Sequence, residues 1–104
     1  MEYTVLYYIG NKVERNTVYD KGVIFIEGNS VYFIDNKYNK MELEYIREVE
    51  LLDFKIRGVL IRVRTNDLCI FLGGYNRILF NKVGTLNINK TKELYTELKN
   101  FIWI

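Results

Sequence analysis

Short runs of β-branched and aromatic residues, separated by turn-forming residues, make up most of the chain. Residues 3–9 form the first run. Residues 22–27 and 31–35 form two more, on either side of Gly28 and Asn29, which both tolerate positive φ. Runs of this length and composition are typical of strands, and the second and third together predict a β-hairpin.

The next run, residues 41–45, alternates strictly between apolar and acidic side chains. Alternation predicts a strand with one buried face, and residues 47–54 predict another strand after it. The side chains expected to point inward are Met41, Leu43 and Tyr45. The side chains expected to point outward are Glu42 and Glu44.

A second hairpin is predicted from residues 58–65 and 68–72. Its turn falls at residues 66–67, which are Asn and Asp, and both visit the left-handed region more readily than other non-glycine residues. The glycines that follow, Gly73 and Gly74, are expected to end the strand.

The C-terminal segment has the period of an amphipathic helix. Its apolar positions recur at intervals of four and three residues, at Leu94, Leu98 and Phe101. Asn89 or Thr91 is expected to cap this helix, with Glu93 in the first turn and Trp103 in the last. Residues 75–87 show no clear pattern, and their segment 77–80 fits either a short strand or one helical turn.

These elements predict a mainly β fold with about seven antiparallel strands and one C-terminal helix. A sheet of that size cannot leave a broad apolar face in water, so we expect a curled sheet or a small barrel. The amphipathic helix is then the natural plug. A chain of 104 residues predicts a single domain, over residues 1–104.

Composition narrows the class of protein. With 49% hydrophobic and 27% charged residues, the chain can bury a core and is unlike a disordered protein. A net charge of +2 is too small to indicate nucleic acid or an anionic membrane as partner. The absence of a long apolar run predicts no membrane span. One cysteine and no signal-peptide pattern lead us to expect a cytoplasmic protein.

The chain offers little for catalysis. It contains no histidine, the commonest general base and metal ligand. Cys69 lies within an apolar run, which favours a buried, inert thiol. The pairs Glu42–Glu44 and Glu48–Glu50 could each bind a cation, but the solvated outer face of a sheet explains them more simply. We therefore expect a protein that is not an enzyme and uses no cofactor or metal.

Basic and aromatic side chains are the candidates for binding. One basic group is Arg57, Arg62 and Arg64, and a second is Lys12, Arg15 and Lys21. Either group could bind an acidic protein surface or a phosphate, although a charged solvent face explains each more simply. The nine tyrosines could stack on single-stranded nucleic acid or form core and cross-strand pairs.

The order of the predicted elements resembles that of the pleckstrin-homology-like superfold. The resemblance is carried by residues 21–26, 31–34 and 43–49, which follow its progression of a glycine-led strand, a second strand and an I-x-x-V segment. Residues 20–102 are also similar to the N-terminal domain of the archaeal taxis adaptor family CheF. The resemblance implies a binding module in archaeal or bacterial signalling, and it assigns no ligand residue.

Two functional hypotheses follow. The first is a non-catalytic protein-interaction module that uses a sheet edge, a loop cluster or the outer helix surface. Its partner would be another protein, and homodimerisation through an edge strand is compatible with it. The second is a small nucleic-acid-binding barrel that uses tyrosines and the arginines between positions 57 and 64. It predicts a continuous basic stripe on the folded surface.

Overall fold

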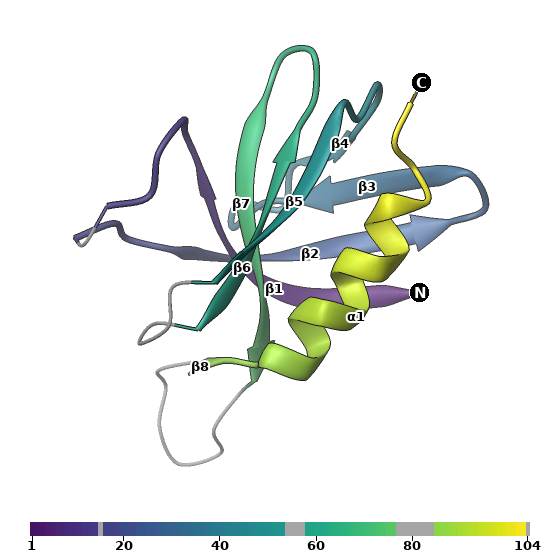
Figure 1. Ribbon diagram of the computed structural model, residues 1–104. Helices are drawn as coiled ribbons and strands as arrows, with labels where there is room; N and C mark the ends of the chain where they lie inside the picture. The colour runs from purple at the N-terminus through teal and green to yellow at the C-terminus, as the bar shows by residue number, and fades with distance from the viewer. Residues whose placement is uncertain (15, 54–57, 77–84, 104) are drawn as a thin grey trace.

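The computed structural model describes residues 1–14, 16–53, 58–76 and 85–103. In these residues the fold is mainly β, with one C-terminal helix, as predicted (Figure 1). The strands are β1 (Glu2–Ile9), β2 (Asp20–Glu27), β3 (Ser30–Ile34), β4 (Lys40–Glu42), β5 (Glu48–Asp53), β6 (Val59–Arg64), β7 (Cys69–Asn76) and β8 (Thr85–Leu86). The helix is α1 (Ile88–Lys99).

The main sheet consists of two meanders, β1 to β4 and β5 to β7, which are joined by the pairing of β1 with β7. Its order is β4-β3-β2-β1-β7-β6-β5, every neighbouring pair is antiparallel, and β8 adds a short pairing to β7. The two ends of this order, β4 and β5, follow one another in the chain but do not pair within the described residues. Of the two predicted forms, the structure is therefore a curled, open sheet rather than a closed barrel.

The core lies inside the curl and includes side chains from both meanders. Its fully buried members include Val5, Ile24, Phe33, Ile61, Val63, Ile70 and Leu72. The ring of Tyr7 packs edge-on against that of Phe33, with centroids 4.7 Å apart. Alternating residues of β1 and β3 thus face inward, as the period-two pattern predicts.

The two glycines expected to end a strand lie inside it. β7 continues through Gly73 and Gly74, which pair with β1. A Cβ atom at Gly74 would lie 2.8 Å from the Cβ of Lys90 and 2.9 Å from the amide nitrogen of Thr91. The prediction was wrong because glycine here permits α1 to approach β7 closely, rather than permitting a turn.

The helix begins before the residues expected to cap it. Its N-cap is Asn87, whose side-chain oxygen accepts a hydrogen bond from the amide of Lys90 at 3.0 Å. Asn89 and Thr91 lie within the helix instead, and Glu93 is beyond the first turn. The error arises because Asn is a strong cap at either position, and only the tertiary contact with β7 distinguishes them.

One face of α1 packs against β5, β6 and β7. Leu94 and Leu98 are fully buried, as the helical period predicts, and Phe101 is half-buried. The helix ends at Lys99, so Trp103 follows the helix and does not lie in its last turn. The described residues contain no helix that is long and apolar enough to span a membrane. The segment 77–80 lies outside the described residues.

Candidate interaction site

The link between β4 and β5, residues 43–47, joins the two ends of the sheet order. A strand continuing to residue 45 was predicted, with Tyr45 pointing inward. That prediction is wrong, because β4 ends at Glu42 and Tyr45 has a φ of 55° with 51% of its surface exposed. Leu43 and Ile46 are buried on either side of it. The left-handed backbone at Tyr45 breaks the alternation and turns its ring to solvent.

The C-terminal tail, residues 100–103, contacts this link. The amide of Trp103 donates a hydrogen bond to the carbonyl of Ile46 at 2.8 Å. The ring of Trp103 meets that of Tyr45 edge-on, with centroids 5.4 Å apart, and the guanidinium of Arg47 lies 4.4 Å from the Trp103 ring. Trp103 is nevertheless 52% exposed. We call Tyr45, Arg47 and Trp103 the aromatic cluster.

Arg47 is itself held in position. Its Nε donates a hydrogen bond to the side-chain oxygen of Asn66 at 2.8 Å, in the turn between β6 and β7. The amide of Arg47 also donates to the carbonyl of Arg64 at 2.7 Å. The aromatic cluster is therefore fixed by three separate segments, which are the link, the tail and this turn, and its exposed rings are presented on a rigid support.

Two cavities lie beside the link. One, of about 270 Å³, is bounded by the turn between β2 and β3, the link and the tail, and its lining includes Val31, Leu43 and Phe101. The other, of about 200 Å³, separates the link from the turn between β6 and β7. Both open next to Tyr45, so the aromatic cluster borders concave surface that could receive the side chains of a partner.

Glu42 and Glu44 border both cavities. Both are exposed, as the alternation predicted. A hydrogen bond with the carboxyl group of Glu42, together with its negative charge, raises the pKa of Glu44. The two carboxyl groups therefore lie side by side, and they make the border of the aromatic cluster acidic.

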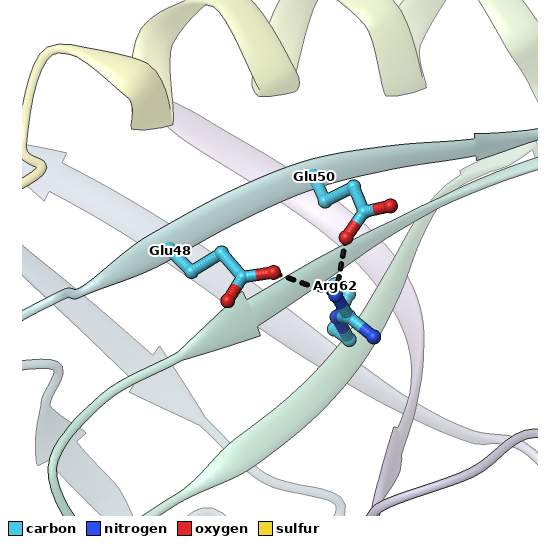
Figure 2. Close-up of polar contacts among 3 residues, drawn as sticks. All are labelled: Glu48, Glu50 and Arg62. Carbon is cyan, nitrogen blue, oxygen red and sulfur yellow. Dashed lines mark hydrogen bonds and ion pairs between the residues drawn. The ribbon is translucent and has the colours of Figure 1, made fainter.

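Arg62, a predicted binding residue, is engaged within the protein. Its Nη2 contacts Oε1 of Glu48 at 2.6 Å and also Oε2 of Glu50 (Figure 2). The hydrogen bond to Arg62 lowers the pKa of Glu48, and the same bond raises that of Arg62. The guanidinium of Arg62, on β6, therefore already supplies a positive charge to the Glu48–Glu50 pair.

Of the other residues in the two predicted basic groups, the structure describes Arg64, Lys12 and Lys21. Arg64 shares a face of β6 with Arg62 and lies opposite Glu48 in the register. Lys21 lies on β2, which β1 and β7 separate from β6 in the sheet order, and its Nζ lies 5.0 Å from the ring centroid of Tyr75. Lys12 is exposed beyond the end of β1. Two of the predicted residues lie outside the described residues, namely Arg15 and Arg57.

Sequence reasoning noted Trp103 but missed its partners. Trp103 was expected in the last turn of the helix, whereas Tyr45 was assigned to the core and Arg47 to an ordinary strand. The signal for Tyr45 was misleading, because its position fits the apolar alternation. Nothing in the amino-acid sequence indicates that its backbone is left-handed. Cys69, expected to be buried, is only partly so.

Comparison with known proteins finds no relative of this chain. No protein-family model matches the chain, and neither a curated protein nor a solved structure matches it. In the described part of the chain, no group of three or more histidine, cysteine, aspartate or glutamate residues could hold a metal ion.

Proposed function

We propose that the chain is a non-catalytic protein-interaction module and that the aromatic cluster binds its protein partner. The observation that carries this proposal is that about half of the surface of Tyr45 and of Trp103 is exposed, while the two rings are in contact with each other. Tryptophan, tyrosine and arginine are the residue types that contribute most to protein–protein binding energy, and the cluster contains one of each.

The backbone of Tyr45 supports the same proposal. A bulky residue with a φ of 55° is rare and costs free energy, whereas glycine or asparagine would adopt this conformation more easily. Conformations of this kind concentrate at functional sites, because the side chain they present is needed there. Here the conformation directs an aromatic ring to solvent beside Trp103.

The fold supports a pleckstrin-homology-like module. Two antiparallel meanders followed by a C-terminal helix agree with the order expected from the resemblance. We propose, on that resemblance, that the module acts as an adaptor in archaeal or bacterial signalling such as taxis. The acidic border at Glu42 and Glu44 favours a protein partner over nucleic acid, because phosphates would be repelled there.

The proposal is tested by capture followed by reconstitution. The full chain is used to isolate partners from lysate of the source organism, with and without nuclease, and the partner is then purified. Its affinity is measured for the wild type and for the double variant Tyr45→Asn/Trp103→Ser. We expect the double variant to bind at least about 30-fold more weakly, as for an interface centre that loses two aromatic residues.

Tyr38→Asn is the matched control, since Tyr38 is also an exposed tyrosine with positive φ, in the turn between β3 and β4. This variant should bind as the wild type does. Equal affinity of the double variant and the wild type would exclude the aromatic cluster as the binding site. Recovery of nucleic acid alone, lost after nuclease or at raised salt, would replace the proposal with the nucleic-acid hypothesis.

A further inference from the structure

β4 forms one end of the sheet order and, among the described residues, has a neighbouring strand on one side only. Just after β4, the amide of Leu43 donates to the carbonyl of Val31 at 2.8 Å, so Leu43 directs its backbone groups toward β3. Because successive strand residues alternate, Lys40 and Glu42 direct their N–H and C=O groups to the open edge. All three residues of β4 are exposed.

The two charged residues of this edge have opposite signs and flank its central residue, Met41. Lys40 precedes Met41 and Glu42 follows it, and the two side chains lie on the same face because they are two positions apart. An antiparallel copy related by a two-fold axis through Met41 would place Lys40 of each chain opposite Glu42 of the other. The charge pattern is therefore complementary to itself.

The backbone favours the same register. Each facing pair of Lys40 and Glu42 would be a hydrogen-bonded pair, in which both residues exchange their N–H and C=O groups. The two Met41 residues would then form the non-hydrogen-bonded pair between them, where side chains approach most closely. Met41 is 38% exposed, so this contact would cover apolar surface that the single chain leaves in water.

We infer that β4 is a self-complementary edge at which a second copy of this chain binds, antiparallel and centred on Met41. The inference goes beyond the proposed function, and it does not depend on the aromatic cluster. The turn between β6 and β7 does not cover the edge by strand pairing, since a cavity of about 200 Å³ separates this turn from Met41 and the link in the described structure.

The opposite end of the sheet order, β5, does not have this property. Its charged residues are Glu48, Glu50 and Asp53, which are all acidic. Because every charged residue of β5 is acidic, no antiparallel pairing of β5 with its own copy could place opposite charges across from each other, and a pairing centred on Val49 would oppose Glu48 and Glu50. The segment before β5 is also covered by the tail, through the hydrogen bond from Trp103 to Ile46. The charge pattern thus selects β4 over β5.

The expected dimer is weak, because β4 has only three residues. Stable interfaces bury about 1,200–2,000 Å², and a three-residue edge with its neighbouring side chains falls below that range. We therefore expect a dissociation constant in the range of about 10 µM to 1 mM and a monomer–dimer equilibrium that depends on concentration.

The test is analytical ultracentrifugation of the full chain over about a hundredfold range of concentration that spans this constant. The wild type should change from monomer to dimer across the range. The single variants Lys40→Glu and Glu42→Lys should each weaken the dimer at least about tenfold, because every facing pair then carries like charges. Lys37→Glu, in the turn before β4, is the matched control and should dimerise as the wild type does.

Two further samples separate a charge-specific pairing from a loss of folding. An equimolar mixture of the two single variants should form a heterodimer, since each Lys again faces a Glu. The double variant Lys40→Glu/Glu42→Lys should dimerise like the wild type for the same reason. A wild type that stays monomeric throughout, or a mixture that fails to dimerise when the wild type does, would overturn the inference. Dimerisation should persist in the aromatic-cluster variant.

Discussion

The hydroxyl group of Thr91, in α1, accepts a hydrogen bond from the amide of Gly74, in β7, at 2.8 Å. The same hydroxyl donates to the carbonyl of Asn87 at 2.7 Å, and Thr91 is fully buried. The amide of Asn87 in turn donates to the carbonyl of Gly74 at 2.8 Å. The first turn of the helix is thus joined to the sheet by polar contacts that water cannot replace.

Replacing Thr91 with valine should therefore destabilise the fold. The change keeps the shape of the side chain but leaves the buried amide of Gly74 without this acceptor, which costs about 1–3 kcal/mol. The free energy of unfolding from urea titration measures the loss. Thr96→Val is the control, since Thr96 is exposed and its hydroxyl donates to the carbonyl of Lys92 within the same helix, so its change should stay within about 0.5 kcal/mol. Equal losses in the two variants would contradict the role given to Thr91.

Gly74→Ala should destabilise the protein by steric overlap. The added methyl group would lie 2.8 Å from the Cβ of Lys90, so the helix would have to move, at a cost of about 1–3 kcal/mol. The matched variant is Gly28→Asn, because a side chain at Gly28 meets nothing within 4 Å and asparagine tolerates its φ of 59°. Urea titration should show that Gly28→Asn loses less stability than Gly74→Ala, and the reverse order would contradict the close approach of helix and strand.

The contact between Arg62 and Glu48 should appear in the pH dependence of stability. Arg62 lowers the pKa of Glu48 in the folded state. A lowered carboxyl pKa stabilises the fold above the ordinary pKa of the group, and this stability is lost as the pH falls through the lowered value. Between about pH 5 and pH 3, the free energy of unfolding should therefore fall more steeply in the wild type than in Arg62→Met.

Thermal or urea unfolding at several pH values measures this slope. The pKa of Asp35 is also lowered, by hydrogen bonds from Asn39 and Lys37, but Asp35 is unchanged in both proteins and contributes equally to both slopes. Lys12→Met removes a positive charge elsewhere on the surface and should keep the steeper slope. Parallel curves for the wild type and Arg62→Met would show that the contact is not maintained in solution.

Tyr45→Asn should leave the stability almost unchanged. The variant loses the ring contact with Trp103, worth about 0.5–1.5 kcal/mol, but asparagine adopts the left-handed backbone with less strain. The lost ring contact and the relieved backbone strain change stability in opposite directions, so the free energy of unfolding should change by less than about 1 kcal/mol. A loss above about 3 kcal/mol would indicate that the ring is needed for folding rather than for binding.

The sequence predicted the elements whose pattern is local. Both hairpins and the stripe of Leu94 and Leu98 were recognisable, because alternation and helical period survive without tertiary information. The errors fall where two elements meet. Gly74 was taken for a turn because only the approach of α1 explains it, and Asn87 was overlooked as a cap for the same reason.

The candidate site was the least predictable part. The aromatic cluster joins Tyr45 and Arg47 to Trp103, which lies far along the chain, and no short-range pattern connects them. The contacts of the predicted arginines were not predictable either. A list of arginines does not show that Arg62 faces Glu48 and Glu50, which only the register of β5 against β6 establishes.

The joining of the two meanders through β1 and β7 has a consequence for the order of folding. β1 to β4 and β5 to β7 can each form from neighbouring segments, but the pairing of Val5 with Gly74 closes a loop that contains most of the chain. Such closure is slow, because its entropy must be lost before the contacts form. During synthesis on the ribosome, the first meander must therefore wait with one side of β1 unpaired until β7 has emerged, and this interval is when the nascent chain is most exposed to aggregation.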